Sequence, residues 1–237
     1  MTLRLLPLLL TALCGVFLGC STAEETTAGG QEPRKKEAAK KVPVSANILL
    51  EIDGDTRRVW VSAELVRNEG PLELFLCRTK TKEHETLLAA DIDARDLHKA
   101  LMLAKGEPGS PVQFLPEYKP ARGSVIKIFV HYEKAGKQVK ESAQSWVRDS
   151  QTGKALTHDW VFAGSKLVPN PFDKEKPPLY LANDGDVICV SNFETALLDL
   201  PIASSKENAE LQFEGFKERL PAVGTKVAIS FEPVIKR

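Results

Sequence analysis

The sequence predicts a mainly β domain of the α+β class, a β-sandwich or an open barrel-like sheet with one clear helix on one side. Three observations lead to this fold class. Many short segments alternate apolar and polar residues, as half-buried strands do; one segment has clear helical periodicity; and turn residues separate the segments. A domain of roughly 190 residues can bury a full hydrophobic core without a metal or a disulfide.

The strands are expected from Val44 onward. Residues 48–52 are apolar, Asp53-Gly54-Asp55 predicts a tight turn, and residues 59–65 then alternate between apolar and polar side chains. A further apolar strand is expected at residues 72–77. The later strands are expected at residues 125–132, 139–147, 160–162, 187–190, 211–213 and 226–231, with another at Tyr180.

The loops between these strands also have recognisable signals. Residues 166–178 contain several prolines and charges, which predicts a long exposed loop. Asn183-Asp184-Gly185-Asp186 has the acidic character of a calcium loop but lacks the spacing of an EF-hand, so a hairpin turn is the better interpretation.

The one clear helix follows Asp93, which can cap its N-terminus. Its apolar residues recur at i, i+3, i+4 and i+7, and they are Leu97, Ala100, Leu101 and Ala104. Gly106 and Pro108 then end the helix. A second, short helix is expected to start at Thr81.

The N-terminal residues predict export. Arg4 precedes an apolar run over residues 5–18, which has the length of a signal-peptide h-region and is short for a transmembrane helix. Gly19-Cys20 resembles the lipobox of bacterial lipoproteins, so we expect residues 1–19 to be a signal peptide and Cys20 to be lipidated. Ordinary signal-peptide cleavage without lipidation is the alternative. The lipid would hold the protein on the periplasmic side of a membrane in the cell envelope, the outer membrane being one option.

A tether follows the expected lipidation site. Residues 20–43 are rich in Ser, Thr, Ala, Gly, Glu and Lys and nearly lack large apolar side chains, so we expect them to be disordered. A single β-rich domain should then occupy residues 44–237. The full chain has 32 basic and 32 acidic residues, and a net charge of zero argues against nucleic acid as its main partner.

Several blocks, in order along the chain, carry a resemblance to a known family. They are residues 72–77, 81–85, 98–101, 146–149, 159–165, 188–193 and 198–201, with Pro221 and Gly224-Thr225. Together they resemble the YdjY-type domain, which is abundant in planctomycete lipoproteins, over residues ~45–235. The resemblance implies an exported domain but no reaction.

Some members of that family carry a ferredoxin-type label, and this chain departs from it. The chain has cysteines at positions 14, 20, 77 and 189 and no Cys-x-x-Cys pair. Two cysteines remain in the expected domain, whereas an iron–sulfur cluster needs about four thiolates. The sequence therefore argues against an iron–sulfur cluster and predicts no cofactor.

The segment from Cys77 to Glu85 is the most suggestive for chemistry. A thiol ends a strand, and Lys82, Glu83, His84 and Glu85 follow it at the expected start of a helix. A thiol near a helix N-terminus and a histidine has a lowered pKa and can act as a nucleophile, which makes Cys77 and His84 the catalytic candidates. The four polar residues and His98 are candidates for ligand binding, and an exposed turn or helix start is the plainer interpretation.

Four interpretations of Cys77 and Cys189 remain open. The two thiols could form a disulfide, as in other exported domains, or they could be buried as small apolar residues. They could bind zinc with His84, Glu85 or His98, although the spacing matches no short zinc motif. Finally, Cys77 could pair with a histidine for catalysis.

These observations lead to three functional hypotheses. The first is a non-catalytic binding or scaffolding domain on the membrane, with an envelope protein or a small ligand as partner. The alternative is a metalloprotein or thiol enzyme built on Cys77, His84, Glu85 and His98. The third is a purely structural component of the envelope.

Overall fold

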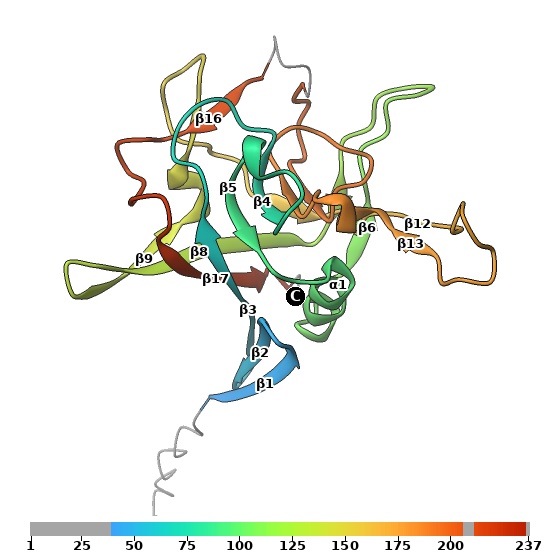
Figure 1. Ribbon diagram of the computed structural model, residues 1–237, viewed down its shortest axis with the longest axis horizontal. Coiled ribbons are helices and arrows are strands. Elements are labelled where there is room, and N and C mark those ends of the chain that lie inside the picture. Colours follow the sequence, from blue (N-terminus) through green and yellow to red (C-terminus); the bar gives the residue numbers. More distant parts are fainter. Residues whose placement is uncertain (1–38, 206–210, 236–237) are drawn as a thin grey trace, which may run out of the picture. The chain divides into compact units, whose positions relative to one another are not determined.

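A long, strongly bent sheet forms the centre of the protein, seen in Figure 1 as a computed structural model. The structure describes residues 39–205 and 211–235. These belong to one compact unit of the chain, residues 37–237. The expected signal peptide, the lipidation site Cys20 and residues 20–38 of the expected tether lie outside the described residues.

Eight strands of this sheet close into a barrel, which confirms a mainly β fold of the barrel-like kind. Three long neighbouring strands form one wall: β3 (Thr56–Leu65), β17 (Lys226–Pro233) and β8 (Val125–Lys134). The ring continues from β8 through β11 (Trp160–Phe162), β15 (Leu198–Asp199), β14 (Ile188–Cys189), β4 (Leu74–Arg78) and β5 (Thr86–Ala90). It closes because β5 pairs with β3, where Leu65 lies opposite Leu88.

Additional strands extend this barrel. Strands β1 (Lys40–Ser45) and β2 (Ile48–Asp53) continue the sheet beyond β3, and β9 (Lys137–Ser142) pairs with β8. Strand β1 begins four residues before the expected start at Val44. Its backbone pairs with β2, Lys40 lying opposite Ile52, and this pairing does not require apolar side chains.

The core follows from the alternation seen in the sequence. In β3 the side chains of Val59, Val61, Ala63 and Leu65 are buried, and the residues between them are more accessible. Large aromatic side chains are fully buried in the main hydrophobic core, among them Phe75, Trp146, Trp160, Phe162 and Phe231. Each fully buried aromatic or aliphatic side chain of this kind contributes roughly 1.5–3 kcal/mol to folding.

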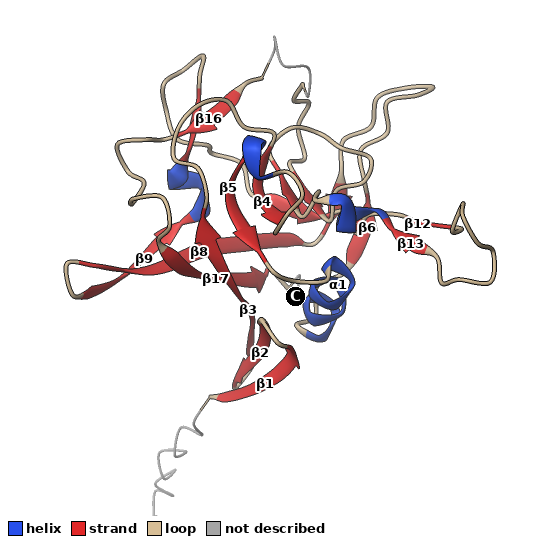
Figure 2. Ribbon diagram, viewed as in Figure 1, coloured by secondary structure: helices blue, strands red, loops and turns tan. Residues whose placement is uncertain are grey.

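Helix α1 (Ala94–Leu103) lies beside the barrel, as Figure 2 shows, and confirms the one clear helix of the sequence. Asp93 caps it, accepting a hydrogen bond from the Arg95 backbone at 2.8 Å. Leu97, Ala100 and Leu101 are buried. Within the described residues, none of the helices combines the length and apolar character needed to traverse a bilayer.

The region after β4 differs from the expected helix at Thr81. A three-residue 3₁₀ helix, η1 (Glu83–Glu85), is followed at once by strand β5, which sequence patterning missed. Strands β4 and β5 are parallel, Leu74 lying opposite Thr86 and Arg78 opposite Ala90. Residues 79–85 must therefore run back along the whole length of β4, a shorter crossover than parallel strands usually have.

Smaller elements complete the fold and correct two expected boundaries. Strand β9 ends at Ser142, and the chain continues as η2 (Ala143–Trp146) and β10 (Val147–Asp149), which pairs with β16 (Phe213–Gly215). Residues 181–184 form the 3₁₀ helix η3 (Leu181–Asp184), where a hairpin turn was expected at residues 183–186.

Two further strand pairs carry exposed loops. Strands β12 (Leu167–Val168) and β13 (Leu179–Tyr180) pair at the base of the expected exposed loop. Strands β6 (Pro108–Ser110) and β7 (Arg122–Gly123) pair at the base of another, which carries Phe114 and Tyr118.

Candidate functional site

The crossover of residues 79–85 brings charged side chains together at one edge of the barrel. The ammonium group of Lys82 lies 2.8 Å from Asp186 Oδ1 and 3.8 Å from Glu85 Oε1. The ring of Phe193 covers the same ammonium group, with its centroid 4.5 Å from Nζ. Glu73 is adjacent to Glu85, and its backbone N–H donates to the Glu85 backbone oxygen at 3.1 Å. We call Glu73, Lys82, Glu85 and Asp186 the crossover cluster.

A glycine allows the crossover and the loop that carries Asp186 to approach each other. Gly185 has a positive φ of 126° and ends η3. A Cβ atom at this position would meet Thr81 Oγ1 at 2.8 Å and Lys82 Cγ at 3.0 Å. A larger residue would therefore push Asp186 away from Lys82.

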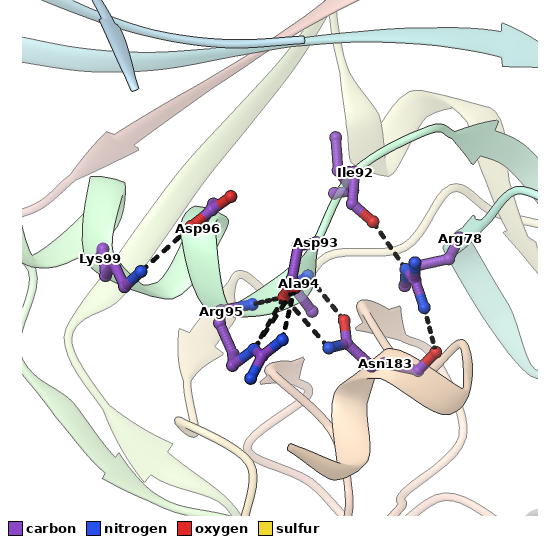
Figure 3. A network of polar contacts seen from close by, with 8 residues as sticks. All are labelled: Arg78, Ile92, Asp93, Ala94, Arg95, Asp96, Lys99 and Asn183. Atoms are coloured by element: carbon purple, nitrogen blue, oxygen red, sulfur yellow. Dashed lines mark hydrogen bonds and ion pairs between the residues drawn. The ribbon is translucent and has the colours of Figure 1, made fainter. Parts of the chain in front are cut away.

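A polar network fixes the same loop from its other side (Figure 3). The side chain of Asn183 accepts a hydrogen bond from the Ala94 backbone at 2.8 Å and donates one to Asp93 Oδ1 at 3.0 Å. Arg78, at the end of β4, donates to the backbone oxygens of Ile92 and Asn183, at 2.6 and 2.8 Å. The crossover, the start of α1 and the loop of Asp186 are thus held as one unit.

Burial shifts the acid–base properties of the crossover cluster. Glu73 is buried, and its pKa is raised by that burial and by the neighbouring charge and hydrogen bond of Glu85. Burial acts to lower the pKa of Lys82, but the hydrogen bond and charge of Asp186 outweigh it, so that pKa is raised. Asp186 has a side chain only 6% exposed and also accepts a hydrogen bond from Thr195. The cluster is consequently a charge-paired group around Lys82, in which Glu73 has a raised pKa.

Cys77 does not have the environment of a nucleophile. Its side chain is fully buried in β4, and burial raises the pKa of its thiol to about 11, despite a hydrogen bond with Thr81 that acts the other way. A thiol with that pKa is ionised to roughly one part in 10⁴ at pH 7. The lowered pKa expected from a helix N-terminus is therefore wrong, because η1 is one turn long and the thiol is buried.

Cys189 is also buried, in a small apolar group with Leu74 and Ala196. Burial raises the pKa of its thiol as well. Both thiols are free, which contradicts the disulfide interpretation and agrees with that of buried small residues.

The other sequence candidates divide into two groups. The first group lies on the crossover. There, Nε2 of His84 lies 3.5 Å from Glu85 Oε2, and the His84 side chain is 77% exposed. Glu83 accepts a hydrogen bond from the Lys80 backbone at 2.8 Å and so shapes the turn. These residues and Lys82 lie together on the crossover, as their positions in the sequence imply.

His98 lies elsewhere, on α1. Its Nδ1 is 2.8 Å from the hydroxyl of Tyr180. Its ring packs edge-on against that of Phe162, with the ring centroids 4.8 Å apart. Burial lowers the pKa of this histidine. Within the described part of the chain, no three His, Cys, Asp or Glu residues are placed to hold a metal ion.

Sequence reasoning missed a pocket that is lined by Asn192, the residue before Phe193. It has a volume of about 630 Å³, within the range of ligand sites. All of its lining residues have uncharged side chains. They are Phe114, Tyr118, Gln151, Asn192, Ala203, Ser204, Ser205 and Gln212. We call this the amide pocket.

A buried hydrogen-bond network forms the floor of the amide pocket. Asn192 is fully buried and donates to Asp199 Oδ1 at 3.2 Å and to the Leu200 backbone oxygen at 3.3 Å. Its own oxygen accepts hydrogen bonds from the Tyr118 hydroxyl, at 3.2 Å, and the Ser204 backbone, at 2.9 Å. Every hydrogen-bonding position of this amide is thereby used.

Asp199, below Asn192, is a carboxyl group in the interior. Its side chain is fully buried, and this burial raises the pKa of Asp199 to about 7, against the hydrogen bonds from Asn192 and two backbone amides. The sequence did contain a signal for these residues. Asp199 interrupts the apolar run from Leu197 to Leu200, and Asn192 follows another apolar run, residues 187–190. Polar residues at such positions are either satisfied internally or functional.

The comparison with family models gave one match. The model of the YdjY domain matches residues 50–232, more than half of the chain and nearly all of the barrel. No curated protein and no solved structure matched the chain.

Proposed function

The chain belongs to the YdjY domain family, and we propose that it is a non-catalytic binding domain, exported and held on an envelope membrane by a lipid on Cys20. The amide pocket is the main observation that supports a binding function. Its volume suits a small ligand, and its lining supplies hydrogen-bonding groups and two aromatic rings.

Hydrogen bonds of Asn192 fix part of the wall of the amide pocket. Asn192 makes four hydrogen bonds within the protein, two of them to segments of the pocket wall, through Tyr118 and Ser204. A wall fixed before the ligand arrives loses little conformational entropy on binding. This preorganisation supports a site that holds a ligand.

The buried thiols favour binding over thiol catalysis. Cys77 and Cys189 are inaccessible and have raised pKa values, so neither has the properties of a nucleophile at neutral pH. We expect iodoacetamide to label the native protein at neutral pH far more slowly than the unfolded protein, as measured by intact mass. Fast labelling of Cys77 in the native protein, lost in Cys77→Ala, would favour the enzyme hypothesis instead.

Ligand-observed NMR with a library of small uncharged fragments tests the binding function. We expect fragments that bind the wild-type chain and lose binding in Gln151→Ala, because Gln151 lines the amide pocket. The matched control is Gln144→Ala, a glutamine whose side chain instead donates to Asp159 at 2.7 Å. If no fragment distinguishes these two variants, the amide pocket is not a binding site.

The membrane location has a separate test, because it depends on the N-terminal residues alone. Lipidation of Cys20 should place the protein in the detergent phase after Triton X-114 partition, and Cys20→Ala should move it to the aqueous phase. A wild-type protein that stays aqueous when expressed in a bacterium would contradict the anchor while leaving the binding function untouched.

A further inference from the structure

The chemistry of the amide pocket indicates the class of ligand it takes. The amide pocket differs in charge from two other pockets of the described residues. One is lined by Lys105, Glu107 and Arg122 among others, and another by Asp55, Arg57 and Glu232 among others. None of the residues that line the amide pocket is formally charged at neutral pH, and Asp199 contacts Asn192 without lining the pocket. The pocket lining therefore lacks the cations that would recognise a phosphate or carboxylate ligand and the acids that would recognise a metal ion or an amine.

Several hydrogen-bonding groups of the pocket remain available as acceptors. The Tyr118 hydroxyl donates its hydrogen to Asn192, and the Ser204 hydroxyl donates its hydrogen to the Val190 backbone oxygen at 2.8 Å. Gln212 donates from its amide nitrogen to Asp149 at 3.0 Å, which fixes the side chain and leaves its oxygen as an acceptor. Oxygens whose own hydrogens are committed can still accept, so a ligand with several hydroxyl donors is favoured.

The rim of the pocket adds apolar surface. The side chains of Phe114 and Tyr118 are partly exposed, at 39% and 42%, and their ring centroids lie 6.3 Å apart with a tilt of 52°. A pyranose ring presents a face of C–H groups that packs on an aromatic ring, and an edge of hydroxyl groups that donate hydrogen bonds. Aromatic rings beside uncharged amides and hydroxyls match both features.

We propose that the amide pocket binds a neutral saccharide, with Phe114 stacking on a sugar face and Gln151 and Gln212 contacting its hydroxyl groups. This inference rests on the proposed binding function and gives it a ligand class. Asn192 is a positioning residue in this scheme, because its hydrogen bonds are all made within the protein.

The test measures the affinity of the full chain for defined oligosaccharides by isothermal titration calorimetry and saturation-transfer NMR. The neutral probes are chitotetraose, cellotetraose and maltotetraose, and tetragalacturonate is the anionic counterpart. At least one neutral probe should bind saturably, and more tightly than the anionic one. Phe114→Ala and Gln151→Ala should each weaken that binding by about tenfold, which corresponds to the loss of one stacking or hydrogen-bonding contact.

Phe172→Ala is the matched control for Phe114→Ala. Phe172 is a nearly fully exposed aromatic residue on the loop between β12 and β13 and does not line the amide pocket. Its removal should leave saccharide affinity unchanged. Because Gln151 and Phe114 are not part of the buried core, a folded variant is expected in each case, which far-UV circular dichroism checks.

The outcomes separate the inference from the function on which it rests. If fragments bind in a Gln151-dependent manner while no neutral saccharide binds, the pocket is a binding site and the saccharide inference is wrong. Tighter binding of tetragalacturonate than of the neutral probes would also overturn it. If neither fragments nor saccharides bind at the pocket, both proposals fail. Equal losses in Phe114→Ala and Phe172→Ala would place the binding outside the pocket.

Discussion

Phe193 packs over Lys82 of the crossover cluster, and the preceding residue, Asn192, lines the amide pocket, yet the two regions use polar residues in opposite ways. In the crossover cluster Lys82 is surrounded by three acidic residues, and the charges are paired with each other. In the amide pocket the side chains are uncharged and line a space of about 630 Å³. The first arrangement satisfies its groups within the protein, and the second leaves hydrogen-bonding groups at a surface that a ligand can reach.

This difference separates polar residues that stabilise the fold from polar residues that are available to bind a ligand. A charge in a mostly buried position must be paired, and losing its partner leaves an uncompensated charge. An uncharged amide at the wall of an open pocket can be hydrated when the pocket is empty, so its removal costs the fold little. The variants that follow test whether the division between the two regions holds.

The largest effect is expected for Lys82→Met. The substitution leaves Asp186 and Glu85 without their cation, and removing one partner of such a pair destabilises a protein by about 3–5 kcal/mol. Because the Lys82 side chain is 26% exposed, the lower end of that range is expected. Urea unfolding measures the change in the free energy of unfolding.

Lys226→Met is the matched control for Lys82→Met. Lys226 also forms an ion pair with a glutamate, Glu64, but both side chains are exposed. Pairs of this kind contribute about 1 kcal/mol or less. If the two lysine variants lose equal stability, the crossover cluster is no more than a surface ion pair, and its contrast with the amide pocket disappears.

The next effect concerns pH and Asp199. Because the folded pKa of Asp199 is raised to about 7, the folded state binds this proton more tightly than the unfolded state. Stability should therefore fall as the pH rises from about 4 toward about 7, the window between the unfolded and folded pKa values, and this contribution should stay constant above it.

Asp199→Asn removes this titration and should flatten the profile. The difference in the free energy of unfolding between wild type and variant should change by on the order of 3 kcal/mol between about pH 4.5 and pH 8. Urea unfolding at a series of pH values gives both profiles. Parallel profiles for the two proteins would show that Asp199 is already ionised in the fold at pH 4.5, and that the pocket floor is a charged carboxylate.

The sequence predicted those elements that local patterns determine. The alternation in residues 59–65 placed the buried face of β3, and Asp93 with the spacing of Leu97 and Leu101 placed the cap and the inner face of α1. Strand β5 was missed because its apolar residues, 87–90, form a continuous run without the alternation that identifies a strand. Its parallel pairing with β4 depends on contacts that a local window does not contain.

The candidate site was predicted in part for the same reason. Lys82, Glu83, His84 and Glu85 are neighbours in sequence, so their common location on the crossover could be foreseen. The partners Glu73 and Asp186 come from distant segments that meet only when the barrel closes. The amide pocket combines residues from five separate stretches, between Phe114 and Gln212. Only the polar interruptions at Asn192 and Asp199 could have indicated it from the sequence.

The smallest effect on stability, and the sharpest separation of the two regions, is expected for Gln151→Ala. Its side chain lines the amide pocket, and the hydrogen bond recorded for this residue, to Asp149, comes from its backbone. Truncating a surface side chain of this kind changes stability by about 0.5 kcal/mol or less. Gln144→Ala removes a side-chain hydrogen bond to Asp159 and should cost about 1 kcal/mol.

Unfolding and binding measured on the same two variants complete the comparison. Gln151→Ala should keep its stability and lose ligand affinity, and Gln144→Ala should lose stability and keep ligand affinity. This opposite pattern is what a division between fold-holding and ligand-serving polar residues requires, because a general loosening of the domain would reduce both quantities together. If Gln151→Ala instead loses as much stability as Lys82→Met, its side chain serves the fold, and the amide pocket belongs with the crossover cluster as structure.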